Sequence, residues 1–277
     1  MATTQKLASP KKSGFQGIRA AFWIIVACFI IAILIFNFML GNPKNFVNDD
    51  PTGAVLHGNL LGTIYKGGMV VPLIHTLLLT VLCLSIERWL ALKTAFGKSS
   101  LTKFVANIKE ALKANDFNKV QDLCGKMKGS VANVVLASLN EYKAMESAPG
   151  LKNSQKIAKI QQAHEEATQL EMPTLQMNLP IIATIVTLGT LTGLLGTVTG
   201  MIKSFAALAA GGGGDSLALS TGISEALINT AFGILTSWCA VVSYNYFTNK
   251  IDKLTYALDE VGYSIAQTYE ANHAEEA

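Results

Sequence analysis

The sequence predicts an all-α, polytopic membrane protein with four transmembrane helices and a helical domain outside the membrane. Only 15% of the 277 residues are charged, whereas about 25% is usual for a soluble domain. Four long runs carry no charge at all, and each could cross the ~30 Å hydrocarbon layer as a helix of ~20 residues. The runs are Ala20 to Pro43, Gly67 to Ile86, Thr174 to Ile202 and Ala226 to Asn249. These observations exclude an ordinary water-soluble protein.

The cationic residues predict the topology. Four of them, between Lys6 and Arg19, precede the first run, and such flanks favour the cytoplasmic side. Residues 87–173 hold Arg88 and twelve of the twenty lysines, which agrees with a cytoplasmic amino terminus. The first run is longer than the apolar part of a signal peptide and lacks a convincing cleavage site. We therefore expect it to stay as a membrane anchor.

Nine segments follow from the runs and the charges. They are 1–19 as a cytoplasmic N-terminus, 20–40 as an extra N-terminal transmembrane helix, 41–66 as an outer segment, 67–92 as transmembrane helix 2, 93–173 as a cytoplasmic helical domain, 174–210 as transmembrane helix 3, 211–221 as a Gly-rich outer loop, 222–248 as transmembrane helix 4 and 249–277 as a cytoplasmic tail.

The cytoplasmic domain is predicted to be amphipathic and helical. Apolar residues recur there at helical spacing, as in Phe104, Ile108 and Leu112. Breaks are expected near Asn115 to Asp116, Gly129 to Ser130 and Pro149 to Gly150. No breaker follows between Gln155 and Met172, which predicts one helix of ~35 to 45 residues continuing from the cytoplasm into the third span. His164 is expected at its surface.

No motif for catalysis, cofactor binding or nucleotide binding is found in the sequence, so we expect a protein that is not an enzyme and needs no metal. The net charge of +3 gives no reason to expect nucleic acid as a partner. The four cysteines lack ligand or redox spacing, and we expect them to be buried as small apolar residues. They are Cys28, Cys83, Cys124 and Cys239.

The third span carries a stripe of small residues on one helical face. Its glycines follow at steps of four, three and four, which allows close approach of another helix backbone. They are Gly189, Gly193, Gly196 and Gly200. Thr190 and Thr197 lie beside this stripe, although a threonine in a membrane helix can simply bond its own backbone.

The fourth span combines an acid, an amide and hydroxyls. Glu225, Asn229 and Thr236 share one face, and Thr230 follows Asn229. Ionisable residues in membrane spans usually serve a function, so this face is predicted to contact water or a polar partner. The alternative is that Glu225 caps the helix start outside the hydrocarbon.

Asn178 to Phe205 and Gly222 to Phe247 resemble spans of the MotA/TolQ/ExbB proton channel family, most closely its ExbB and TolQ branch. The likeness covers about residues 67 to 255. Its motifs are Gly-Leu-Leu-Gly-Thr-Val at 193–198, Gly-Ile-Ser-Glu-Ala-Leu at 222–227, Thr-Ala-Phe-Gly at 230–233, Tyr244-Asn245 and Glu87-Arg88.

The resemblance implies an inner-membrane homopentamer in which the third and fourth spans line a pore. The pore would hold the single spans of two ExbD/TolR-like partner subunits, which carry the protonated aspartate. Thr197 and Thr230 would lie on the ion path, with Glu225 near its outer end. We assign Asn229, which shares a helix face with Glu225, to the same path. The resemblance also implies that this complex is a proton-driven motor. It would act with a TonB-like protein in outer-membrane transport, or in envelope maintenance as in the TolQ branch.

Two departures from the family pattern leave questions open. The first span is extra, and a lipid-facing position is expected for it. Asn229 stands where alanine is common, which leaves proton and sodium as alternatives for the coupling ion. The glycine stripe is also compatible with a passive membrane scaffold, which is the competing hypothesis. A substrate transporter is disfavoured because the spans show no internal repeat.

Overall fold

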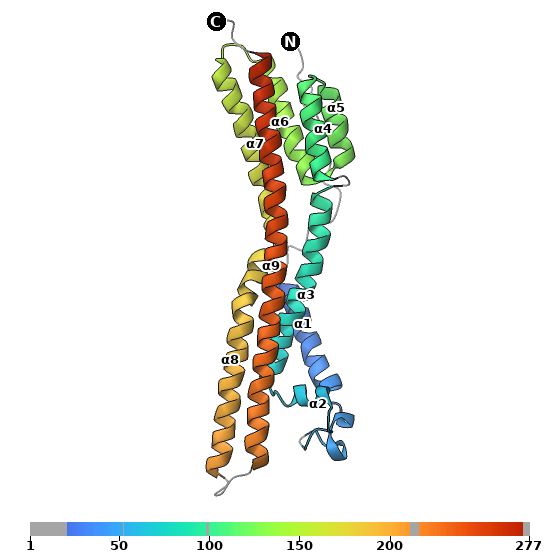
Figure 1. The fold of residues 1–277 in the computed structure, drawn as a ribbon, viewed down its shortest axis with the longest axis vertical. Coiled ribbons are helices and arrows are strands. Elements are labelled where there is room, and N and C mark those ends of the chain that lie inside the picture. The colour runs from blue at the N-terminus through green and yellow to red at the C-terminus, as the bar shows by residue number, and fades with distance from the viewer. Residues whose placement is uncertain (1–20, 52, 98–99, 211–215, 274–277) are drawn as a thin grey trace. The chain divides into compact units, whose positions relative to one another are not determined.

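The computed structural model describes residues 21–51, 53–97, 100–210 and 216–273. These residues form helices and connecting turns, with no β-strand among them beyond one isolated bridge between Phe46 and Val55 (Figure 1). Four helices are long and apolar enough to span a membrane. The predicted class, an all-α membrane protein, is therefore confirmed. The predicted segment 1–19 and residues 211–215 of the predicted outer loop lie outside the described residues.

The chain divides into two compact units. We call the first the span unit; its described residues are 21–51, 53–86, 178–210 and 216–246. We call the second the bundle unit; its described residues are 87–97, 100–177 and 247–273.

The span unit contains the four apolar helices. α1 (Ala21–Leu34) continues into a π-helical turn (Ile35–Leu40), and two short 3₁₀ turns (Pro43–Asn45 and Val47–Asp49) follow. The short α2 (Leu60–Tyr65) precedes α3 (Val70–Ala95), whose residues from Glu87 onward are assigned to the bundle unit. α8 (Leu179–Ala210) and the first part of α9 (Ser216–Asn272) complete the unit. The helix ends do not locate the membrane surfaces, so the predicted segment boundaries stay predictions.

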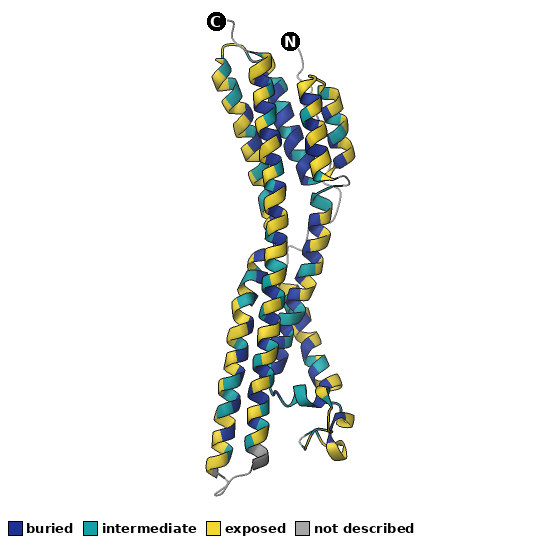
Figure 2. Cartoon of the chain, viewed as in Figure 1, coloured by how far each residue is buried: buried dark blue, intermediate teal, exposed yellow. Residues whose placement is uncertain are grey.

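The bundle unit is built from amphipathic helices around an apolar core (Figure 2). Its helices are α4 (Leu101–Lys113), α5 (Phe117–Met127), α6 (Gly129–Glu146), α7 (Asn153–Gln176) and the last part of α9. The helices end close to the predicted breaks. Ile108, Leu139 and Leu258 are fully buried in the core. At its edge, the buried Arg88 pairs with Glu87 and donates to the carbonyl oxygen of Thr174 at 3.1 Å.

The predicted helix running from Gln155 into the third span is wrong. α7 ends at Gln176 and α8 begins at Leu179. Asn178 between them has a φ of 64°, the left-handed conformation that asparagine tolerates better than most residues and that stops an α-helix. The long continuous helix is instead α9, with 57 residues.

Two side-chain expectations also need correction. His164 is buried rather than exposed, because α6 and α9 cover it. Of the cysteines, Cys28 and Cys124 are buried as expected, but Cys83 is exposed and Cys239 half-buried. The pattern of apolar residues places these sulfurs in helices without showing which face of each helix is covered.

Candidate functional site: the paired helices α8 and α9

The glycines of α8 lie against α9 and bring the two backbones together. A Cβ atom added at Gly193 would lie 3.1 Å from the backbone oxygen of Asn229, and one at Gly200 would lie 2.8 Å from that of Gly222. A Cβ at Gly189 would lie 2.6 Å from the hydroxyl of Ser237. At Gly200 the nearest atoms belong to the backbone of α9, which cannot move aside independently, so this position requires glycine while the helices stay this close. A Cβ at Gly193 would need the two helices to shift slightly apart.

Two hydroxyls meet across this contact. The side chains of Thr197 on α8 and Thr230 on α9 form a short hydrogen bond. Each also has a carbonyl oxygen of its own helix within reach, Gly193 at 3.2 Å for Thr197 and Ala226 at 3.2 Å for Thr230. A hydroxyl both donates and accepts, so the pair can pass a hydrogen-bonded proton along. Both side chains are half-buried.

Asn229 lies beside this pair and is fully buried. Its Nδ2 donates to the carbonyl oxygen of Gly67 at 2.8 Å, which joins α9 to the turn before α3. Its Oδ1 has no hydrogen-bond partner among the described residues. A Cβ at Gly196 would overlap the Asn229 side chain, with Cγ at 2.7 Å. Glycine on α8 therefore makes the room for this amide.

Glu225, one helical turn before Asn229, is buried and paired. Lys203 on α8 donates to Glu225 Oε1 at 2.6 Å, and the exposed fractions of the two side chains are 58% for lysine and 8% for glutamate. Gly68 covers another side, since a Cβ there would reach the Glu225 carboxylate, with Cδ at 3.0 Å. Gly68 has a φ of 74°, a second reason for glycine at this turn.

The structure thus brings together all four residues predicted for the ion path, in one strip along α9 and the facing side of α8. Their role in ion movement stays a prediction. Thr190 extends the strip by a 2.8 Å hydrogen bond to Ser237. His75 on α3 packs over the ring of Phe232, with ring centroids 5.1 Å apart.

Sequence reasoning missed Lys203 and the turn at Gly67 and Gly68. The signal for Lys203 was available, because Lys203, Asp215 and Glu225 are the only charged residues between Thr174 and Asn249. A single cation there is a natural partner for an acid in the next helix. The turn gave no such signal, since paired glycines occur in many connections.

Figure 2 shows exposed residues along α8 and α9 in the single chain, and many of them are large and apolar. Leu194 and Leu195 are 57% and 54% exposed, and Trp238 is 62% exposed. Large exposed apolar side chains on a membrane helix are expected to contact lipid or other protein. This exposure fits the strip just described, which has polar groups between two helices that are apolar outside.

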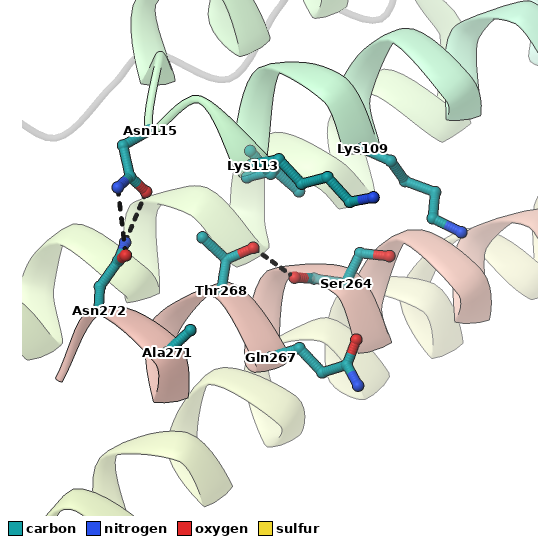
Figure 3. Close-up of a pocket in the computed structure, with 9 residues that line it drawn as sticks. Lys109, Lys113, Asn115, Ser264, Gln267, Thr268, Ala271 and Asn272 are labelled. Carbon is teal, nitrogen blue, oxygen red and sulfur yellow. Dashed lines mark hydrogen bonds between the residues drawn. The ribbon is translucent and has the colours of Figure 1, made fainter. Parts of the chain in front are cut away.

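The bundle unit offers a weaker candidate. A cavity of about 300 Å³ lies between α4 and α9, as Figure 3 shows. Its polar groups are largely bonded to the protein itself: Asn115 to Asn272, Thr268 to the carbonyl oxygen of Ser264, and Lys109 to Glu260 at 2.7 Å. Among the residues that the structure describes, no group of three or more metal-ligating side chains occurs.

Comparison with known proteins agrees with the sequence motifs. The MotA/TolQ/ExbB proton channel family matches residues 127–260. The Tol-Pal system protein TolQ of Pseudomonas aeruginosa is 25% identical over 206 residues, which cover 72% of this chain and 87% of the relative. The putative biopolymer transport protein ExbB-like 3 of Synechocystis is 36% identical over 87 residues, covering 31% of this chain and 41% of that protein.

The family match includes α8, all of the described strip on α8 and α9, and much of the bundle unit. It thereby confirms the resemblance drawn from the two spans: residues 127–260 of this membrane protein match the MotA/TolQ/ExbB proton channel family.

Proposed function

We propose that this chain is the channel-forming subunit of a motor in the bacterial inner membrane that is driven by the proton-motive force. The observation that carries the proposal is the hydroxyl pair of Thr197 and Thr230 between two apolar helices, beside Asn229 and Glu225. Lipid-facing anchors have no need of such a strip. Polar groups kept inside membrane helices are typical of ion pathways.

The chain needs a partner to carry protons. Between Thr174 and Asn249 its acids are Asp215 and Glu225, and none lies in the middle of either span. An ExbD/TolR-like protein with a single span and an aspartate would supply the missing carboxylate. We propose two such spans inside a homopentamer, with α8 and α9 lining the pore. The exposed apolar faces of these helices leave surface for both neighbouring subunits and lipid.

In this mechanism a proton enters from the outer side past Glu225 and binds the partner's aspartate. It leaves past Thr197 and Thr230 towards the cytoplasm. Each charge that crosses 100 mV of potential supplies ~2.3 kcal/mol, so a few protons move the partner against a substantial load. The reaction makes and breaks no covalent bond in a substrate, and the subunit is not an enzyme.

For the process that is energised, we propose TonB-dependent outer-membrane transport, with a TonB-like protein as a further partner. The alternative is a role in envelope maintenance. The similarity to the Tol-Pal system protein TolQ supports this alternative. In both, the N-terminus is cytoplasmic and the bundle unit lies on the cytoplasmic side, in agreement with its lysines.

The test is proton uptake into liposomes that contain the full chain and its single-span partner. We expect Thr197→Val and Thr230→Val to lower uptake severalfold, because valine keeps the shape and removes the hydroxyl. Thr184→Val is the matched control, since Thr184 is exposed on α8 and bonds only the carbonyl oxygen of Pro180 at 2.8 Å. If both variants assemble and retain full uptake, the proposed ion path is contradicted and the passive scaffold is favoured instead. Replacing external protons by sodium in the same assay identifies the ion.

A further inference from the structure

Glu225 is enclosed on two sides by groups that are held in place. The turn at Gly67 and Gly68 covers one side. Asn229 holds this turn at a single point, because its Nδ2 donates to the Gly67 carbonyl oxygen at 2.8 Å. Backbone hydrogen bonds from Gly68 to Tyr65 at 3.1 Å and from Val71 to Gly68 at 3.2 Å stiffen the turn. The second side is α9 itself.

Lys203 closes the remaining side of Glu225. Unlike the turn and the helix, it does so with a flexible side chain. Its side chain is 58% exposed, while that of Glu225 is 8% exposed. A lysine ammonium is a compact charge on a flexible stem that can swing into water. The carboxylate has no such freedom. Among the contacts of Glu225 with described residues, the one to Lys203 can therefore open without moving a backbone.

We propose that Lys203 is a tethered cation that closes Glu225 and must release its carboxylate before an external cation binds there. This inference rests on the proposed function and names a further residue of the same path. Lys203 acts as a positioning residue, through Glu225, and carries no ion itself.

The arrangement has a consequence for ion choice. A hydrated metal cation that approaches Glu225 meets the ammonium of Lys203, which repels it and occupies the site it would need. A proton needs no coordination shell and can reach the carboxylate as soon as the ammonium swings away. Lys203 therefore favours protons over sodium, and its loss is expected to relax that preference.

The first experiment needs no partner. The full chain in liposomes is treated with a hydrophobic carbodiimide, which modifies protonated carboxyl groups, and labelling of Glu225 is followed by mass spectrometry. Loss of one charge-assisted hydrogen bond corresponds to a change of about tenfold, so Lys203→Gln is expected to label about tenfold faster than the native chain. Lys203→Arg keeps the charge and the donor, and is expected to label slowly.

Three controls make the result specific. Glu225→Gln should give no labelling of that peptide, and Lys44→Gln, which removes an exposed lysine, should label at the native rate. If Lys203→Gln does not assemble, Lys203→Met replaces it, because methionine keeps an unbranched apolar chain and removes the charge. Native-rate labelling of an assembled Lys203→Gln or Lys203→Met chain would overturn the proposal, because Lys203 would then not shield Glu225.

A second experiment separates the two proposals. In liposomes with the partner, Lys203→Gln should admit more sodium relative to protons than the native complex, and Lys203→Arg should restore the native ratio. Should the native complex carry no ions, the proposed function fails, while the labelling still decides whether Lys203 closes Glu225. If the native complex carries protons and the ratio is unchanged in Lys203→Gln, the gating role of Lys203 fails alone.

Discussion

The span unit and the bundle unit hold their helices together in opposite ways. In the bundle unit, large side chains such as Leu139, Tyr142 and Tyr269 are fully buried between helices. In the span unit, glycines occupy the contact between α8 and α9, and large residues such as Leu194 point outward. The hydrophobic effect drives the first kind of packing, whereas close backbone contact and polar groups hold the second. Adding atoms at the glycine contacts should therefore destabilise the span unit. Removing atoms from the buried side chains should destabilise the bundle unit.

The largest effect is expected from adding bulk at Gly196. Gly196→Val places new atoms where the Asn229 side chain lies, and a Cβ alone would already be 2.7 Å from Asn229 Cγ. The helices must separate, so we expect loss of the assembled protein in detergent, measured by size-exclusion chromatography. Leu195→Val changes an exposed neighbour and should assemble normally. An assembled Gly196→Val protein would contradict the close packing of α8 and α9.

Removing a buried charge should be nearly as severe. Arg88 is fully buried and pairs with Glu87, whose side chain is 4% exposed. Arg88→Ala leaves a carboxylate buried without this partner, which typically costs about 3–5 kcal/mol. Thermal unfolding by circular dichroism in detergent measures it. Lys109→Ala breaks the exposed pair with Glu260 and should cost under ~1 kcal/mol; equal effects in the two variants would refute the distinction.

Removing apolar atoms tests the core of the bundle unit. Leu139 is fully buried and Leu170 is 77% exposed, so the same change to alanine probes both environments. We expect Leu139→Ala to lower the unfolding free energy by about 2–5 kcal/mol, and Leu170→Ala to change it by less than ~0.5 kcal/mol. Urea unfolding provides the values. A comparable loss at Leu170 would mean that another surface covers it in the assembled protein.

The smallest effect expected is a pH dependence of the bundle unit. Burial lowers the pKa of His164, partly offset by the charges of Asp259 and Glu165. Its Nδ1 is 2.9 Å from Ser138 Oγ, and its Nε2 has no hydrogen-bond partner in the described part of the chain. Since the folded unit favours neutral histidine, stability should be greatest above the ordinary pKa of ~6.5 and fall as the pH drops below it.

Hydrogen exchange in α7, corrected for its intrinsic pH dependence, measures this effect at about pH 7.5 and pH 5.5. The His164→Gln variant should lose the dependence, whereas His57→Gln, which changes an exposed histidine, should retain it. A dependence that persists without His164 would assign it to other groups.

The sequence shows the helices of both units because charge and periodicity are properties of neighbouring residues. It also places the strip residues on the correct faces, since the spacing of Gly193 and Gly196 or of Glu225 and Asn229 follows the helical repeat. Local patterns do not show features that depend on contacts with segments distant in the sequence. His164 is buried because Gly262 on α9 leaves space for its ring, a Cβ there being 2.5 Å from Nε2. The break at Asn178 depends on one backbone angle of a residue that also occurs within helices.

The connection between α7 and α8 differs from the long helix α9 in what bending would require. Between α7 and α8, the helical hydrogen-bond ladder is already interrupted at Asn178. A rotation about the backbone bonds there changes the direction of α8 without breaking an i to i−4 bond. In α9 the ladder continues from Ser216 to Asn272, so bending it sharply requires the loss of such bonds. The connection between α7 and α8 is therefore expected to bend more easily than α9.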